Sequence, residues 1–334
     1  LLRAHPNGGH RITLNKNGHR LPERFGIVRA ICSPDWIAVD RPQLVSLVSE
    51  ISDLLESEYV FPEVARRIAA ELKRKAANGG YDTRATDSDL AEILTDDIRS
   101  VNGDKHLLVV PTMPGRTSPT AKESERRLKL MREHNFGFKT VEMLDSGVGY
   151  LEIDAFIDTV FEGAGQAAVN AMQLLSSAQH LIVDLRENGG GSPSMVQLVS
   201  TYLFDGEPIH LNSFYFRKSD SYKQFWTLPF VPGKRLPRVP VYVLTSSATF
   251  SGAEEFAYNL QALQRASVVG EPTGGGANPG DFMRVDASFE IFIPHGRAVN
   301  PITNANWEGS GVQPDELCDA QDALGRALAL CGKA

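Results

Sequence analysis

The chain has 334 residues, of which 42% are hydrophobic and 22% charged, and its formal net charge is -7. This composition is typical of a globular protein, and the length favours two domains or one large domain with a smaller appendage. A negative net charge without a basic cluster argues against a nucleic-acid binder. No apolar run reaches the roughly 18 residues that a membrane-spanning helix needs, so we expect no membrane span.

Residues 1–36 are rich in Gly, Pro, Asn, Arg and His and show no periodicity, which predicts an irregular arm to which we assign no function. They contain no signal-peptide core, so export with a signal already removed and a cytoplasmic location both stay open. From Pro42 onward, apolar residues recur at helical spacing in three stretches, the last of which follows the capping sequence TDSD. Residues 37–110 are therefore predicted to form a small helical domain.

Residues 111–140 begin with a stretch rich in Pro, Ser and Thr and are predicted to be a linker. In residues 141–334, short apolar runs bounded by turn residues alternate with helix-like stretches, as in an α/β domain. The runs are GVGYLEI, HLIVDLR, VPVYVLTS and SVVGEPT. Two of them end in polar, glycine-rich turns, which is where ligands bind in open α/β sheets.

The three cysteines, Cys32, Cys318 and Cys331, form no C-x-x-C pair and have no histidine neighbours at metal-ligand spacing. This pattern argues against a zinc site and against a dense disulfide framework. One disulfide stays open, so the cysteines do not indicate the compartment.

Ser251 follows the apolar run VYVLTS after a short turn and begins a stretch with helical spacing. A hydroxyl at a helix N-terminus meets backbone N–H groups and the positive end of the helix dipole, which suits a nucleophile. Ser251 and Glu254 also match a capping box, S-x-x-E, which requires no catalysis. Both interpretations stay open from the local sequence.

Three further features are ambiguous when taken one at a time. The stretch DLRENGGGS places Gly190 and Gly191 directly after an apolar run, and these glycines could form an oxyanion hole or a flexible turn. The stretch is not a phosphate-binding loop, because no G-K-[ST] follows it. His106, in GDKHLLV, is a candidate base or a structural histidine. Glu308, in WEGSGVQPD, is a candidate orienting acid or a surface residue.

Taken in order, the stretches GDKHL, GYLEIDAF, LIVDLRENGGGS, TFSGAEEFA, VVGEPTGGG and WEGSGVQPD resemble one serine peptidase family over residues 40–330. This family includes the C-terminal processing peptidases, the tricorn protease core and interphotoreceptor retinoid-binding protein. The resemblance implies an α/β (α+β) core of the Clp protease and crotonase type with a small N-terminal helical domain. It also implies that Ser251 is the nucleophile, with oxyanion N–H groups from Gly252 and from Gly190 or Gly191.

The resemblance further distinguishes two ways of activating the serine. The processing peptidases use a Ser-Lys dyad, but Gly276 occupies the lysine position here, and there is no room for their peptide-binding PDZ insert before GVGYLEI. The tricorn-like branch uses a histidine from a D-x-H motif and a glutamate from E-x-x-G-V-x-P-D, which match His106 and Glu308. The tricorn core has a serine where this chain has Lys105, so we predict a Ser-His-Glu triad and no tetrad.

We therefore expect a serine peptidase that hydrolyses peptides or unfolded chain ends through an acyl-enzyme, without a metal or an organic cofactor. The alternative is a binding protein on the same fold that holds a retinoid or a fatty acid without hydrolysis. A crotonase-like acyl-CoA enzyme would share the fold, but it does not explain Ser251 and His106 together. The oligomeric state and the compartment stay open.

Overall fold

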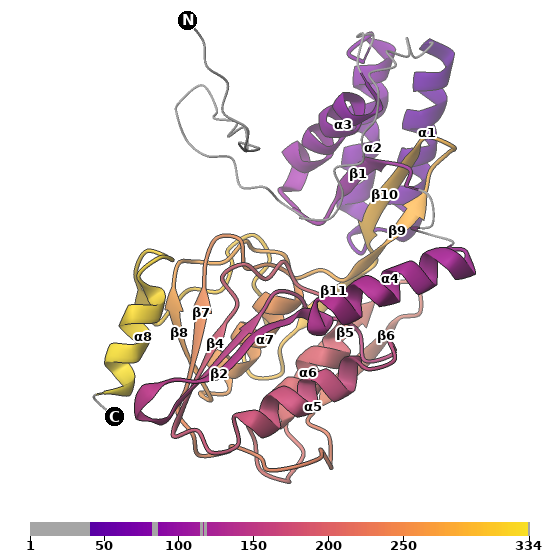
Figure 1. Ribbon diagram of the computed structural model, residues 1–334. Helices are drawn as coiled ribbons and strands as arrows, with labels where there is room; N and C mark the ends of the chain where they lie inside the picture. Colours follow the sequence, from indigo (N-terminus) through magenta and orange to yellow (C-terminus); the bar gives the residue numbers. More distant parts are fainter. Residues whose placement is uncertain (1–40, 82–85, 114–115, 117–118, 333–334) are drawn as a thin grey trace, which may run out of the picture. The chain divides into compact units, whose positions relative to one another are not determined.

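The computed structural model describes residues 41–81, 86–113, 116 and 119–332. The predicted irregular arm, residues 1–36, and Cys32 lie outside this range. Residues Ser33–Ala334 belong to one compact unit. All the elements described below belong to this unit (Figure 1).

Three helices follow one another at the start of the described chain, as the apolar periodicity predicts. Helix α3 begins with a capping box between Thr86 and Asp89, and the left-handed Gly103 ends it. Helix α2 has a proline in its first turn, where the missing N–H leaves no hydrogen bond broken. Their bounds are α1 Arg41–Glu58, α2 Pro62–Ala77 and α3 Asp87–Asn102.

A three-stranded antiparallel sheet, in the order β1-β10-β9, completes the core of these helices. Its bounds are β1 Leu108–Pro111, β9 Gly280–Arg284 and β10 Phe289–Pro294. Phe289, Ile291 and Ile293 alternate along β10 and pack with buried residues of the three helices. The helical region therefore contains the β9-β10 hairpin, which comes from far along the chain. The predicted helical domain, residues 37–110, does not include this hairpin.

The second part of the fold is a six-stranded sheet in the order β12-β8-β7-β4-β3-β2. All neighbouring pairs are parallel except β2 and β3. The strand bounds are β2 Phe138–Met143, β3 Val148–Ile153, β4 His180–Asp184, β7 Val241–Thr245, β8 Ser267–Gly270 and β12 Glu316–Leu317. The helix bounds are α5 Ala164–Leu174, α6 Pro193–Thr201, α7 Gly252–Ala262 and α8 Ala323–Cys331.

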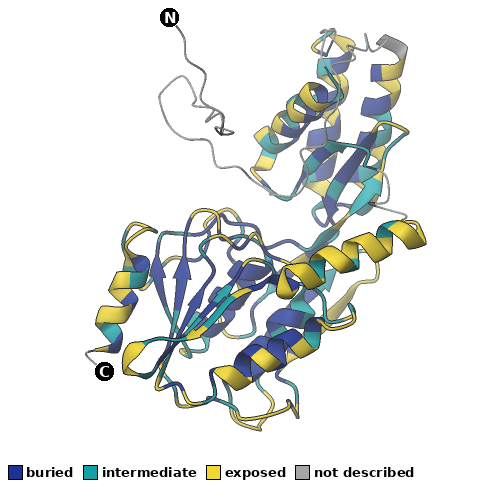
Figure 2. Ribbon diagram, in the orientation of Figure 1, coloured by how far each residue is buried: buried dark blue, intermediate teal, exposed yellow. Residues whose placement is uncertain are grey.

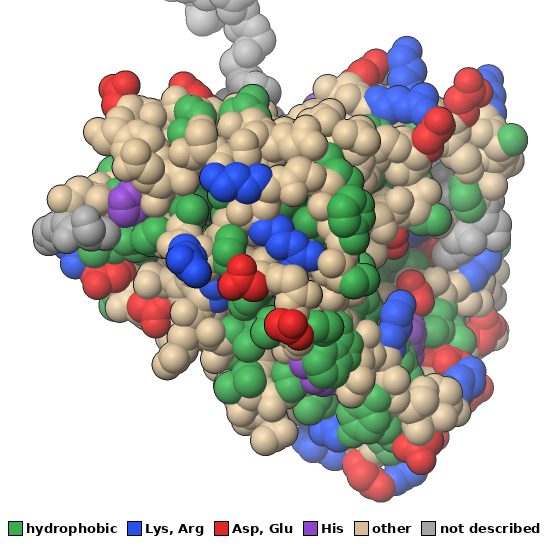
Figure 3. Space-filling model, turned by 90° about the horizontal axis from the view of Figure 1, so that it is seen from below, with side chains coloured by type: hydrophobic (Ala, Val, Ile, Leu, Met, Phe, Trp, Pro, Cys, Tyr) green, Lys and Arg blue, Asp and Glu red, His purple; other side chains and the backbone are tan. Residues whose placement is uncertain are grey.

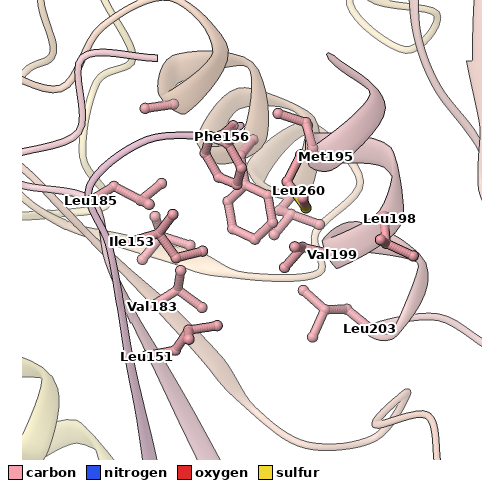
Figure 4. Close-up of a cluster of buried hydrophobic side chains, with 14 of the residues drawn as sticks. Leu151, Ile153, Phe156, Val183, Leu185, Met195, Leu198, Val199, Leu203 and Leu260 are labelled. Carbon is pink, nitrogen blue, oxygen red and sulfur yellow. The ribbon is translucent and has the colours of Figure 1, made fainter. Parts of the chain in front are cut away.

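Helices cover both faces of this sheet. Leu181 and Val183 of β4 belong to the core that α5, α6 and α7 close, whereas Ile182 faces the core under α8. Figure 4 shows part of the larger core, in which Phe156 lies among side chains of β3, β4 and α6. Burial on both faces explains why the strands have continuous apolar runs without alternation.

The rest of the fold consists of a smaller antiparallel sheet, one exposed helix and two short 3-10 turns. The sheet order is β11-β5-β6. The bounds are β5 His210–Phe216, β6 Ser221–Trp226, β11 Gly296–Val299, α4 Ala121–Glu133, and the turns Asn135–Gly137 and Asp145–Gly147. Helix α4 lies in the range expected to be a linker; a capping box between Thr120 and Glu123 starts it, and Figure 2 shows how exposed it is.

The surface carries charges of both signs. On the face that Figure 3 shows, Lys and Arg side chains lie among Asp and Glu side chains and form no continuous basic stripe. Among the described helices, none combines the length and the apolar character that crossing a bilayer requires.

Candidate active site

Ser251 lies in the tight turn between strand β7 and helix α7. Its backbone has φ 54° and ψ -119°, a region that a non-glycine residue rarely adopts without support from its surroundings. Support comes from Phe250, whose N–H donates to the carbonyl of Asn188 (3.0 Å), and from Glu254, which accepts the Ser251 N–H (2.8 Å). The turn places the hydroxyl at the N-terminus of α7.

His106 reaches Ser251 from the turn between helix α3 and strand β1. Its Nε2 lies 3.1 Å from Ser251 Oγ, although the two residues are 145 positions apart in the chain. The rings of Phe250 and Phe292 flank the imidazole, with centroids 4.6 and 5.7 Å away. Burial lowers the pKa of His106 below its usual 6.5, so the neutral, proton-accepting form predominates at neutral pH.

Glu308 lies beside His106, on the loop after β11. Its Oε2 accepts the Ala277 N–H (2.7 Å), whereas its Oε1 and the His106 Nδ1 are buried without a hydrogen-bond partner among the described residues. One donor or acceptor atom from each of Asp104, His106 and Glu308 lies within 4.8 Å of the others.

The environment of Glu308 disfavours its charged form. Burial raises the pKa of Glu308 above its usual 4.5, and the nearby charge of Asp104 raises it further. The backbone N–H of Ala277 acts in the opposite direction, because it stabilises the carboxylate. The site therefore holds one imidazole and two carboxyl groups, of which Asp104 is buried and Glu308 is partly buried.

Asp104 is a site residue to which the sequence analysis assigned no separate role. Its Oδ1 accepts the His106 N–H (2.9 Å), and its Oδ2 accepts from Tyr59 Oη (2.8 Å) and Asn278 Nδ2 (3.2 Å). Carboxylate and imidazole are also metal ligands. Three hydrogen bonds already use most of the acceptor positions of the Asp104 carboxylate.

The glycines predicted to form the oxyanion hole lie against Ser251, but only some of their N–H groups are free of a hydrogen bond within the described residues. The Gly190 N–H donates to Asn188 Oδ1 (2.8 Å). No hydrogen bond engages the N–H of Gly191 or of Gly252 within the described residues. A Cβ atom on Gly252 would lie 3.0 Å from Gly191 N, so the two groups are neighbours. The local sequence carries no signal for the contact of Asn188 with Gly190.

Two family models match the chain. "Peptidase family S41" matches residues 147–318, which is more than half of the 334 residues. "N-terminal domain of Peptidase_S41 in eukaryotic IRBP" matches residues 35–142. The chain therefore belongs to peptidase family S41, which places it among the serine-type peptidases and confirms the family expected from the motifs.

Solved structures share the fold. A lipoprotein from Streptococcus agalactiae matches with a TM-score of 0.59 at 14% identity, over 92% of this chain and 99% of its own. Mature CPAF complexed with lactacystin matches with 0.58 at 12% identity, over 87% and 97%. The tricorn protease matches with 0.55 at 14% identity, over 87% of this chain and 36% of its own. These likenesses confirm the expected fold class, a helical region with a sheet core.

Proposed function

We propose that the chain hydrolyses peptide bonds through an acyl-enzyme on Ser251, with His106 as the base and Glu308 as the group that orients it. The observation that carries this proposal is the 3.1 Å contact between His106 Nε2 and Ser251 Oγ in a largely buried site. A hydroxyl of ordinary pKa needs such a base to become a nucleophile.

In the proposed reaction, Ser251 Oγ attacks the carbonyl carbon of the substrate while His106 Nε2 takes its proton. The same proton then passes to the leaving amine as the peptide C–N bond breaks. Water attacks the ester in the second half, with His106 again as the base. Glu308 would accept the Nδ1–H of His106, which keeps Nε2 free to accept a proton.

The second oxyanion donor is assigned to Gly191 in this proposal. The N–H groups of Gly191 and Gly252 are neighbours and unengaged, whereas Asn188 occupies the Gly190 N–H. Two backbone donors aimed at the developing oxyanion stabilise it by about 3 kcal/mol each. The donors need no reorganisation, because the backbone holds both.

The surroundings of Gly276 favour the triad over a Ser-Lys dyad. A Cβ atom there would overlap the Phe250 ring and lie 2.7 Å from His106 Cε1, so the position has no space for a lysine stem. Lys105 is engaged elsewhere, because its Nζ donates to the carbonyl of Gly274. Peptides or unfolded chain ends are the proposed substrates, and the mechanism needs no cofactor.

A fluorophosphonate reagent tests this proposal. Since only an activated serine reacts quickly, we expect one adduct on the folded chain, mapped by peptide mass spectrometry to Ser251 and not to Ser246 or Ser247. The heat-unfolded chain is the control and should not react. No adduct on a folded sample would reject the peptidase and favour the non-catalytic ligand-binding alternative, to be tested with retinoids and fatty acids.

Gly191→Ala should displace the proposed oxyanion donor, the Gly191 backbone N–H. The Gly191 φ is +138°, and a Cβ atom would overlap the carbonyl group of Phe156, so the backbone must shift. We expect kcat to fall by about 10²-fold, as when one oxyanion donor is lost, together with a lower Tm. The rate per folded molecule, from labelling kinetics and circular dichroism, separates the two effects; an unchanged rate would contradict the assignment.

A further inference from the structure

Besides Asp104, the proposed reaction leaves a second buried carboxyl group beside the nucleophile unused. Glu254 lies in the first turn of helix α7, three residues after Ser251, and its side chain is fully buried. Burial raises the pKa of Glu254 to about 7. A buried carboxylate costs stability unless hydrogen bonds compensate it, so its partners indicate its role.

Four hydrogen-bond donors converge on Glu254. Its Oε2 accepts the backbone N–H groups of Ser251 and Gly276, both at 2.8 Å. Its Oε1 accepts the Gly275 N–H at 2.6 Å and the Thr273 hydroxyl at 2.5 Å. A carboxylate can accept all four bonds, whereas a protonated carboxyl or an amide cannot.

Three of these donors come from a distant segment, which we call the glycine loop, residues 273–276. A capping box explains only the bond to the Ser251 N–H. The glycine loop lies against the base, because a Cβ atom on Gly276 would come within 2.7 Å of His106 Cε1. Glu254 therefore joins the backbone of the nucleophile to the segment that borders the imidazole.

The same loop is also bonded to the segment that carries Glu308. The Thr273 Oγ1 accepts the Val312 N–H (2.7 Å), and the Gly309 N–H donates to the Gly275 carbonyl (3.0 Å). The Trp307 Nε1 donates to the Gly276 carbonyl (2.8 Å). A continuous set of hydrogen bonds thus runs from Ser251 through Glu254 and the glycine loop to residues 307–312.

We infer that Glu254 is a positioning residue. By binding the glycine loop to the turn that carries Ser251, it keeps Ser251, His106 and Glu308 at the distances and orientations that the reaction requires. This inference rests on the proposed peptidase function. Glu254 does not take part in proton transfer in this scheme. Its effect is on the geometry of the three side chains, and a displacement of about 1 Å in such a site can lower the rate about 10²-fold.

The test compares Glu254→Gln with Glu255→Gln. Glu255 is an equally buried neighbour on α7 that contacts Asn212 and not the glycine loop, so it controls for the loss of a buried charge. For Glu254→Gln we expect fluorophosphonate labelling per folded molecule and kcat to fall by about 10²-fold with KM nearly unchanged, because Glu254 does not touch substrate. The control should keep the native rate.

Hydrogen–deuterium exchange measures, independently of catalysis, whether Glu254 stabilises the glycine loop and residues 307–312. Glu254→Gln should speed exchange in peptides covering 273–276 and 307–312, whereas Glu255→Gln should not. Unchanged exchange in these peptides, or native labelling by folded Glu254→Gln, would overturn the inference. If the native chain does not label at all, the proposed peptidase function fails, and exchange still decides whether Glu254 holds the loop.

Discussion

Replacing Ser251 by alanine is expected to abolish peptide hydrolysis, and His106→Ala is expected to lower kcat by about 10⁶-fold, because the two groups act as one unit. Without His106, the Ser251 hydroxyl keeps its proton and is a poor nucleophile. Without Ser251, no acyl-enzyme forms. Initial rates on an unfolded protein substrate, with labelling of the same samples, measure both effects.

The Ser251 variant needs a control for backbone strain. Ser251 has a positive φ, which alanine also adopts at a cost of about 1 kcal/mol or more, whereas glycine adopts it freely. Ser251→Gly should therefore be inactive yet at least as stable as Ser251→Ala. Hydrolysis that survives in either variant would show that another group is the nucleophile.

Glu308→Gln is expected to lower kcat by about 10⁴-fold while it preserves packing. The Ala277 N–H keeps the amide oxygen at the Oε2 position, so the amide nitrogen takes the Oε1 position and cannot accept the His106 Nδ1–H that defines the reactive tautomer. The variant should still bind substrate with a KM close to native. Steady-state kinetics together with circular dichroism test this expectation. A rate within about tenfold of native would reassign the orienting role to another group.

The pH dependence of kcat/KM shows whether Glu308 or His106 causes the loss of activity at low pH. Glu308 must be ionised to act, and its raised pKa moves the acid limb of kcat/KM above the range of an ordinary carboxyl group. The groups facing it are Asp104, His106 and Glu254. Because the pKa of His106 is lowered, the imidazole does not titrate in this part of the profile. Glu254, whose pKa is also raised, titrates in the same pH range as Glu308. In Glu308→Gln the fall of kcat/KM on the acid side should therefore be less steep but still present.

The same shift predicts a stability effect of Glu308. The pKa of Glu308 in the folded state lies above its unfolded value of 4.5. Glu308 therefore makes a favourable contribution to the free energy of unfolding that is fully present below pH 4.5 and is lost as the pH rises through the folded-state pKa. At pH 8, Glu308→Gln should therefore have a higher Tm than the native chain, and the difference should shrink at pH 5. A lower Tm at pH 8 would contradict an unfavourable buried charge.

The sequence by itself indicated the family, the three N-terminal helices and the strands of the core. These depend on short-range features: apolar periodicity, caps such as Thr86 with Asp89, and motifs that keep their order along the chain. The same motifs pointed to Ser251, His106 and Glu308 as candidates. Their catalytic roles stay predictions.

Only the tertiary structure decided which of these residues meet and which backbone groups are free. The contact of His106 with Ser251 joins positions 145 residues apart, the Gly190 N–H is taken by Asn188, and the hairpin 280–294 packs against the first three helices. Glu254 fits a local cap by sequence, yet most of its partners come from the glycine loop. Such contacts arise from the packing of distant segments, which local propensity and periodicity do not encode.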